Sequence, residues 1–460
     1  MKKGRMRNLF LSASVILTLC TATLTPSQTV FAVGCKEQKT NVKISIEASG
    51  SYSNWDGVTN VSQFQTSDGE FCFAYDKGSY VYVVKTKKGV PQTKQIKLKK
   101  KTKQFGAVTC DADGNYYVVT GQSNSTEDIG KNTVFISKYD ATGKMIASTG
   151  DNGSSSLAYY YGNSFYTKYP FDGGNCDIAV NGDYVAVNYA REMYSGHQSN
   201  SLFVVDKNTM KLVKIDSYYN SHSFAQRVIP YEDRFLLASE GDCYDRAFTV
   251  SLADAKTGDC SSSNIFDFWV EKGAFERYDM FVINNNFAHM GGIATGKDGN
   301  AALVATSVKS LSSQANKENE QLFIQIFDPD KNLNSAEAYV TTGVRRGLAG
   351  SNGDEKVTNY GVKWLTNYSG KYWLRNPQVV ATGMGNYVIL FERYKDGHGY
   401  QGVYTVTVDQ NGKKLGKVTQ ISKNAYLNPS EMPVYANGKI YWAGNNTKKD
   451  NIHIYSFAVK

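Results

Sequence analysis

The sequence lacks the motifs that mark most familiar enzymes. It contains no Gly-x-Ser-x-Gly nucleophile elbow, no phosphate-binding glycine loop and no His-Glu-x-x-His zinc-protease helix. Histidine and proline are also scarce, with five His and eight Pro in 460 residues. These absences argue against nucleotide enzymes and against hydrolases of the types named.

Cysteine is sparse, and its spacing excludes familiar cysteine sites. The seven Cys form no Cys-x-x-Cys pair and show no zinc spacing. A strand between Cys243 and Cys260 would hold them roughly 20 Å apart, too far for a disulfide. Cys20 falls in a predicted signal peptide. We expect the other six to be mostly buried free thiols: Cys35, Cys72, Cys110, Cys176, Cys243 and Cys260.

Long apolar runs are confined to the N-terminus. Basic residues precede the apolar run Leu9–Leu19, and Val30-Phe31-Ala32 is a small-residue cleavage pattern. The run is too short to cross about 30 Å of hydrocarbon, so it predicts a secretory signal peptide over 1–32, in a style typical of Gram-positive bacteria. The mature chain, 33–460, is then a secreted single domain. The alternative is a lipoprotein anchored through Cys35.

Neither sign of charge is in marked excess. The net charge is +9, and four positive charges lie in the predicted signal peptide. Such a mild balance gives no reason to expect nucleic-acid binding. The basic run Lys97–Lys103 is either a solvated loop or a contact with an anionic wall polymer.

The chain does contain 32 Tyr, 41 Gly and short apolar runs without helical periodicity, which predicts an all-β protein. Residues 105–148 hold one complete unit, with strands at 105–109, 116–120, 133–139 and 144–148. The turn Asp113-Gly114-Asn115 makes the first two strands a hairpin. One small sheet cannot bury both of its faces, so this unit needs neighbours of its own kind.

Tight-turn signals repeat along the chain between paired apolar runs. Seven of them join first and second strands, at 68–70, 113–115, 181–183, 231–234, 298–300, 383–386 and 437–439. The seventh unit has only three strands, and the unpaired segment Val42–Ala48 can supply its fourth. We therefore predict a seven-bladed β-propeller of four-stranded antiparallel blades, with the ring closed by this N-terminal strand. Six or eight blades are the alternatives, because 273–290 is irregular.

One unit resembles a known repeat. Gly114-Asn115-Tyr116-Tyr117-Val118, Thr133–Lys138 and Ala141-Thr142-Gly143 are similar to the SBBP-type repeat of secreted bacterial β-propellers. The resemblance covers about a tenth of the chain. It implies a propeller scaffold of a family without established activity, and it carries no catalytic residues to transfer.

The connections between strands are of two kinds. Those between strands one and two, and between strands three and four, are two to five residues long and share one face of the ring. The others include 150–175, 190–199, 307–321 and 342–376. Because binding groups concentrate in long loops, we expect any function on this long-loop face.

Carboxylates at the ends of second strands are the first site candidates. Alignment places seven residues at the rim of the central funnel: Asp76, Gly121, Tyr189, Glu240, Thr306, Glu392 and Asn445. In an enzyme, Glu192, Glu240 and Glu392 would converge there. Their pKa values would then be set by Arg191, Arg246 or Arg393. The competing interpretation is that these mouth residues are hydrated and pair locally.

Three of the five His also lie in these loops. His197 and His222 come from adjacent blades, and their convergence with Glu192 or Asp242 would make a metal or acid–base site. No spacing is typical of a metal site, so the competing interpretation is that these His brace loops. We predict no metal and no cofactor.

Aromatic residues gather in the long loops as well. They either pack beneath the loops or present flat faces on which a sugar or peptide stacks. The ligand-binding candidates are Tyr160, Tyr166, Trp364 and Tyr400, together with Asp242, Arg246 and His398.

These patterns predict a secreted, monomeric binding module that takes an extracellular glycan or protein on its long-loop face. The first alternative is a carbohydrate-active enzyme. It would be a glycosidase with two carboxylates, or a polysaccharide lyase with a His and an Arg at a uronic acid. The further alternative is a structural cell-surface protein without a small ligand.

Overall fold

The computed structural model describes most of the chain. It covers residues 34–459 except 54, 156–164, 195, 217, 242–246, 268–287, 308–319, 334–361 and 369–371. The predicted signal peptide lies outside the described residues. None of the described helices has the length and apolar character that a membrane crossing requires.

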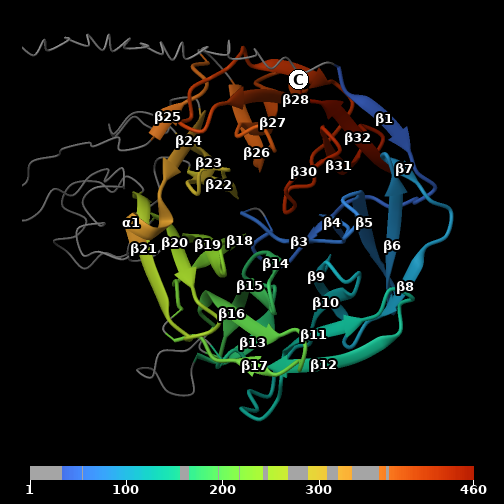
Figure 1. Ribbon diagram of the computed structural model, residues 1–460, viewed down its shortest axis with the longest axis vertical. Helices are drawn as coiled ribbons and strands as arrows, with labels where there is room; N and C mark the ends of the chain where they lie inside the picture. Colours follow the sequence, from blue (N-terminus) through green and yellow to red (C-terminus); the bar gives the residue numbers. More distant parts are fainter. Residues whose placement is uncertain are drawn as a thin grey trace, which may run out of the picture.

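Seven small antiparallel sheets stand in a ring, which confirms the predicted seven-bladed β-propeller (Figure 1). Blade 1 contains β4 (Val61–Gln65), β5 (Phe71–Lys77), β6 (Tyr80–Lys87), β7 (Val90–Pro91) and β8 (Ile96–Lys99). Blade 2 contains β9 (Gln104–Cys110), β10 (Tyr116–Gly121), β11 (Val134–Tyr139) and β12 (Met145–Asp151). Blade 3 contains β13 (Thr167–Pro170), β14 (Cys176–Asn181), β15 (Tyr184–Met193), β16 (Gln198–Asp206) and β17 (Leu212–Val213).

The remaining blades follow the same plan, with the first strand of each nearest the axis. Blade 4 contains β18 (Ser223–Tyr231), β19 (Arg234–Gly241), β20 (Ala247–Ala253) and β21 (Cys260–Asp267). Blade 5 contains β22 (His289–Thr295), β23 (Ala301–Ser307), β24 (Gln321–Phe327) and β25 (Val362–Trp364). Blade 6 contains β26 (Tyr372–Ala381), β27 (Tyr387–Lys395), β28 (Gly399–Val408) and β29 (Thr419–Ser422). Blade 7 contains β30 (Val434–Ala436), β31 (Lys439–Asn445), β32 (Ile452–Ala458) and β1 (Lys36–Lys39).

The hairpin turns form where the sequence predicts them, because local side chains fix their geometry. All seven predicted first turns join first and second strands. Between third and fourth strands, Asp140 Oδ1 accepts hydrogen bonds from the backbone N–H groups of Thr142 at 2.9 Å and Lys144 at 3.0 Å. Gly143 has φ +93°, a left-handed conformation that glycine adopts without steric cost.

The ring is closed by an N-terminal strand, but not by the predicted segment. β1 pairs antiparallel with β32, with Lys36 opposite Ser456 and Lys39 opposite His453. The assignment of this strand to Val42–Ala48 was wrong. All four side chains of β1 are exposed, so no alternation of apolar residues marks it in the sequence.

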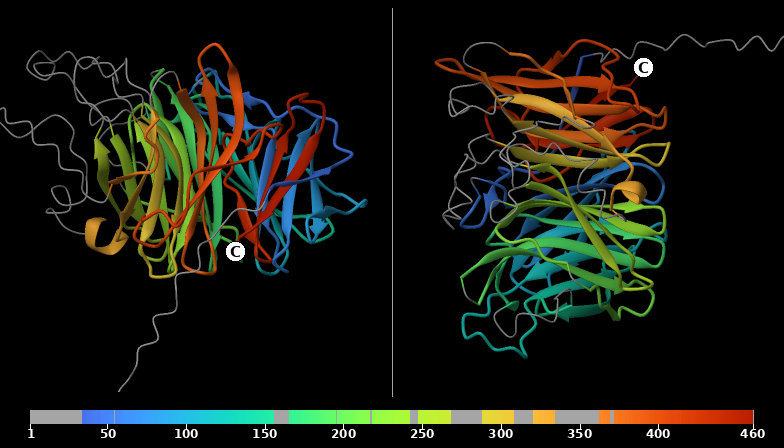
Figure 2. Two further views of the ribbon diagram at one scale, coloured as in Figure 1. Left: turned by 90° about the horizontal axis from the view of Figure 1, so that it is seen from above. Right: turned by 90° about the vertical axis from the view of Figure 1, so that its left-hand side faces the viewer.

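The connections between second and third strands share one face, which the orange turn between β27 and β28 marks along the upper side of the left view in Figure 2. Three predicted loops were wrong in part: β13 lies within 150–175, β15 and β16 both extend into 190–199, and β25 and β26 both begin within 342–376. Residues 328–361 instead connect the third and fourth strands of blade 5. They start on the short-turn face with α1 (Pro329–Leu333). Residues 342–361 lie outside the described residues.

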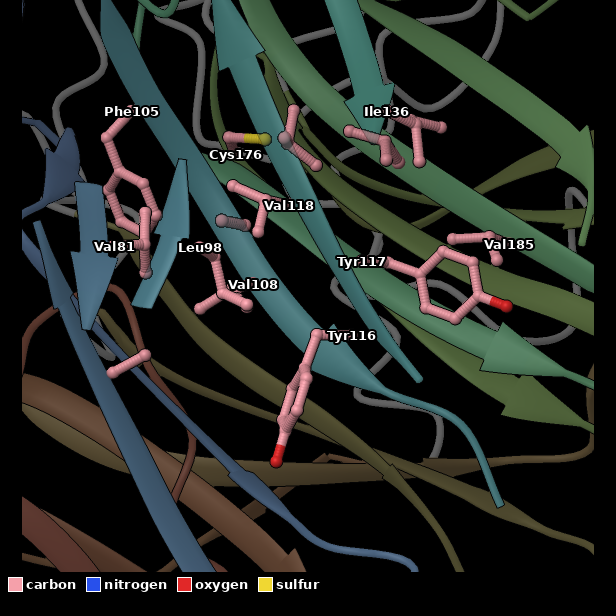
Figure 3. Close-up of a cluster of buried hydrophobic side chains, with 14 of the residues drawn as sticks. Val81, Leu98, Phe105, Val108, Tyr116, Tyr117, Val118, Ile136, Cys176 and Val185 are labelled. Atoms are coloured by element: carbon pink, nitrogen blue, oxygen red, sulfur yellow. The ribbon is translucent and has the colours of Figure 1, made fainter. Parts of the chain in front are cut away.

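The hydrophobic core lies between neighbouring blades. In Figure 3, Tyr117 of β10 lies beside Val185 of β15, and both are fully buried. Burying a side chain of this kind stabilises the fold by about 1.5–3 kcal/mol. The Tyr117 hydroxyl donates to Asp111 Oδ2 at 2.8 Å, so its polar end is satisfied.

Five of the six mature cysteines are described, and none of these five forms a disulfide. Cys72 and Cys176 are buried, whereas Cys35, Cys110 and Cys260 are half-buried. The prediction of free thiols is confirmed for these five. Cys243 lies outside the described residues.

Candidate functional site

The segment after β1 crosses the long-loop face toward the axis of the ring. We call residues 40–57 the N-terminal strap. Ser51 Oγ donates to Asp172 Oδ1, beyond β13, at 2.9 Å. Near the axis, Asp56 Oδ2 lies 3.4 Å from Arg227 Nη1 of β18. Strap residues line two cavities, and Ala48 belongs to the lining of both. Figure 1 shows the chain passing from β1 at the rim of the ring to β3 (Val58–Thr59) near its centre.

The larger cavity has a volume of about 670 Å³. Its polar lining comprises Glu47, Ser49, Ser51, Thr59, Asn60, Asp76, Gln104, Ser123, Asp172 and Glu192. Its cyclic and aromatic lining comprises Phe105, Tyr169, Pro170 and Phe171. No Lys or Arg is found among the described residues that line it. The cavity is therefore acidic, although the chain as a whole is basic.

Asp76, at the end of β5, is anchored from behind the cavity. Its Oδ1 lies 2.7 Å from Lys100 Nζ, and that lysine side chain is almost fully buried. Burial raises the pKa of the Asp76 carboxyl, and the lysine charge opposes the rise. Of the four acids that line the cavity, Asp76 is the one with a salt bridge in the described part of the chain.

Glu192 and Asp172 are neighbours in this cavity. Burial raises the pKa of Glu192, and the negative charge of Asp172 raises it further. Lys168 partly opposes this effect, but its Nζ is engaged by Glu127 Oε1 at 2.9 Å. Two carboxylates of unequal environment thus face the same space.

The prediction that Arg191 sets the pKa of Glu192 was wrong. Adjacent residues of β15 point to opposite faces of the sheet, so Arg191 turns away from Glu192. The Arg191 side chain is fully buried, and its Nη1 donates to Gly153 O at 3.0 Å. It holds the loop after β12 rather than a cavity carboxylate.

Phe171, part of the aromatic lining of the larger cavity, packs against two glycines of blade 2. Phe171 has φ +66°, an uncommon conformation for a residue other than glycine. A Cβ at Gly121 would lie 2.7 Å from the Phe171 ring, and one at Gly106 would lie 2.9 Å from it. The two glycines of blade 2 therefore leave the space in which Phe171 sits.

Glu240 and Glu392 lie at the ends of second strands, as the alignment predicted, but they are buried and join neighbouring blades. Glu240 Oε2 accepts from Met290 N of blade 5 at 2.7 Å. Glu392 Oε1 accepts from Leu427 N, ahead of β30 of blade 7, at 2.8 Å. Neither lines the larger cavity, so the structure does not bring them together with Glu192.

Arg393 is likewise separated from Glu392 by strand alternation. Its guanidinium lies over the rings of three tyrosines at 4.1–5.2 Å, namely Tyr368, Tyr372 and Tyr404. Burial raises the pKa of Glu392 to about 7, opposed by the hydrogen bonds from Leu427 N and the Tyr394 hydroxyl. The pairing of Arg393 with Glu392 was therefore wrong.

His197 and His222, from adjacent blades, lie next to each other. Their ring centroids are 4.6 Å apart. No group of three or more His, Cys, Asp or Glu within the described ranges has a geometry that would hold a metal ion. Asp242 and Arg246 lie outside the described residues. The third His, His398, is exposed in the β27–β28 turn.

The predicted aromatic candidates are dispersed. Tyr166 is half-buried against the ring of Tyr194, with centroids 5.7 Å apart. Trp364 lies in the outer strand β25 and packs on Phe323, so its assignment to a loop was wrong. The Tyr400 hydroxyl donates to Ala425 O. Tyr160 lies outside the described residues.

Sequence reasoning missed the strap and its contacts. Glu47 lies in the segment that was predicted to be the closing strand, Trp55 was not singled out in the sequence, and Asp172 is 121 residues from its partner Ser51. No spacing rule joins such residues. Fixed loop partners such as the Ser51–Asp172 hydrogen bond become visible only once the ring is closed.

Comparison with known proteins supports no relationship beyond architecture. No family model matches the chain, and no curated protein matches it. A solved structure of a protein of unknown function from Dyadobacter fermentans is 8% identical over 94% of this chain and 100% of its own, with a TM-score of 0.43.

Two solved carbohydrate-active enzymes are similar at the same level. The polysaccharide lyase Uly1 is 8% identical over 93% of this chain and 100% of its own, with a TM-score of 0.47. An α-L-arabinofuranosidase from Fusarium graminearum is 11% identical over 94% and 98%, with a TM-score of 0.39. Similarity this low carries no argument about ligands, so the function proposed below rests on the site itself.

Proposed function

We propose that the protein is a secreted binding module that takes a glycan into the larger cavity on its long-loop face. The observation that carries this proposal is the acidic, aromatic-floored lining of that cavity. Export rests on the N-terminal sequence pattern.

The lining suits neutral or amine-bearing sugars. Carboxylate oxygens accept hydrogen bonds from sugar hydroxyls or ammonium groups, and such charge-assisted bonds are the stronger kind. The half-buried ring of Tyr169 offers an edge or face for a pyranose. A uronic acid or a sulfated sugar would meet four carboxylates and no cationic group among the described lining residues, which disfavours an acidic glycan here.

A glycosidase is the second candidate function, because Glu192 and Asp172 share the cavity. The raised pKa of Glu192 suits a general acid, and Asp172 would then be the base or nucleophile. This candidate replaces the trio of glutamates expected from the sequence.

A glycan array tests the proposal. The chain lacking 1–32 is applied to neutral, amine-bearing and acidic oligosaccharides, and bound sugars are then incubated with the protein to detect cleavage. We expect saturable binding to the neutral or amine-bearing class. Glu192→Gln should weaken it by about tenfold. Asp113→Asn should not weaken it, because that exposed carboxylate lies in a turn on the opposite face.

The outcomes separate the candidates. Binding without cleavage supports the module, and binding with cleavage supports the glycosidase. If the folded protein binds none of the three classes of oligosaccharide, glycan binding is contradicted, and a protein ligand or a structural role is favoured.

A further inference from the structure

The smaller cavity lies on the other side of the strap, next to the ion pair of Asp56 and Arg227. Its volume is about 160 Å³, enough for a small molecule or one terminal group of a larger one. Its main lining residues are Trp55, Asp56, Arg227, His289, Thr306 and Arg375. These residues come from the strap and from blades 4, 5 and 6.

The charge of this lining is opposite to that of the larger cavity. Two arginines and one aspartate give two positive charges and one negative, a net of +1. Arg227 is committed to Asp56, and its Nε donates to Gly291 O at 2.7 Å. Arg375 is half-exposed, and its Nη1 donates to Glu320 Oε2 at 3.4 Å and to Leu374 O at 3.3 Å. Its Nε and Nη2 have no partner within the described part of the chain, so they are available to an incoming anion.

Two further polar side chains point to a ligand. Thr306 is fully buried, lines the cavity, and its Oγ1 has no hydrogen-bond partner within the described part of the chain. Such an orphaned hydroxyl is costly unless something binds it. His289 lies nearby, and burial lowers its pKa to about 4, with the Arg375 charge adding to the effect. The neutral imidazole supplies one donor and one acceptor.

Trp55 supplies a flat wall. Its side chain is 41% exposed, which is unusual for so large an apolar group. Its ring stacks on Phe224 with centroids 5.4 Å apart and planes 18° apart. The His289 ring is 5.9 Å away. The ring is thus held in place from one side while part of its surface remains open to solvent.

We propose that the smaller cavity binds a small carboxylate, or a carboxylate-bearing sugar residue, with the anion at Arg375 and Thr306 and the remainder against Trp55. A metal cation would be repelled by the two guanidinium groups. A neutral sugar would leave Arg375 without a new partner. This proposal does not rest on glycan binding in the larger cavity.

Titration with glucuronate, acetate and glucose, followed by calorimetry and tryptophan fluorescence, tests the proposal. We expect saturable binding of glucuronate and none of glucose. Acetate binding at similar affinity would identify a free carboxylate as sufficient, whereas weaker acetate binding would show that the sugar ring contributes. Arg375→Gln and Thr306→Val should each weaken binding by about tenfold or more.

Controls keep the test decisive. Arg375→Lys retains the charge and should retain part of the affinity, and Arg234→Gln alters an arginine at a turn on the opposite face and should change nothing. The proposal fails if glucuronate and acetate do not bind the folded protein, if glucose binds equally well, or if Arg375→Gln binds like wild type.

Discussion

Asp56 of the strap and Arg227 of β18 form an ion pair in which both side chains are nearly buried, 8% and 2% exposed. Ser430 Oγ also donates to Asp56 Oδ1 at 2.9 Å. The pair ties the strap to blade 4, and the serine ties it to the segment before blade 7. Both cavities share this strap, so the pair underlies the geometry of both.

Breaking this pair should destabilise the fold. Asp56→Asn removes the salt-bridge partner of the buried Arg227, and losing one partner of a buried pair costs about 3–5 kcal/mol. Chemical denaturation measures the loss. Asp216→Asn is the matched control, because its pair with Lys214 is exposed and should contribute less than about 1 kcal/mol. Equal effects of the two substitutions would contradict this role of Asp56.

The stability of the protein should fall as pH rises from about 4.5 to 8. Burial raises the pKa of Glu431 to about 8, opposed by the Gln63 N–H and reinforced by the charge of Asp177, while Arg227 partly offsets the rise. The pKa of Asp177 is itself raised to about 6. Between the unfolded and folded pKa values the native state holds more protons, so raising the pH favours unfolding.

Glu431→Gln removes this titration while keeping an oxygen that can accept the hydrogen bond from Gln63 N. The variant should be more stable than wild type at pH 8, and its stability should change less between pH 5 and 8. Denaturant titrations at both values measure this. A variant whose stability falls as steeply as that of wild type would show that Glu431 is not a titrating group in this range.

Glu392 should prove structural. Glu392→Ala removes the acceptor for Leu427 N and for the Tyr394 hydroxyl, each otherwise satisfied at 2.8 Å. Leaving buried donors unpaired costs about 1–3 kcal/mol each, so unfolding should need less denaturant. Glu392→Gln keeps acceptor capacity and should cost less. The folded Glu392→Gln variant should bind ligand as tightly as wild type. A loss of ligand binding in this variant would show that Glu392 belongs to the binding site.

Ring closure depends on β1. Removing residues 33–39 leaves β32 as an unpaired edge that can associate with other chains. Size-exclusion chromatography should show self-association, and denaturation should show lower stability. A truncated chain that remains monomeric and equally stable would show that closure is dispensable.

Local signals account for what the sequence predicted correctly. Asp113-Gly114-Asn115 and the aspartate at Asp140 determine their turns through short-range hydrogen bonds, so turn positions and strand pairs were legible. β1 was missed because its side chains are exposed. Glu240 and Glu392 lie at the ends of second strands, as predicted. Their side chains are buried and bond to neighbouring blades, so they do not converge with Glu192. Glu192 was predicted, but its neighbour Asp172 needed the tertiary structure.

The most direct test of the central claim is calorimetric titration of an array-selected neutral or amine-bearing oligosaccharide into the wild-type protein and Asp172→Asn/Glu192→Gln. Losing two charge-assisted hydrogen bonds should weaken binding by about a hundredfold. The paired substitution Asp113→Asn/Asp254→Asn, in turns on the opposite face, should leave the affinity unchanged. Wild-type affinity in the cavity variant would show that the larger cavity is not the glycan site.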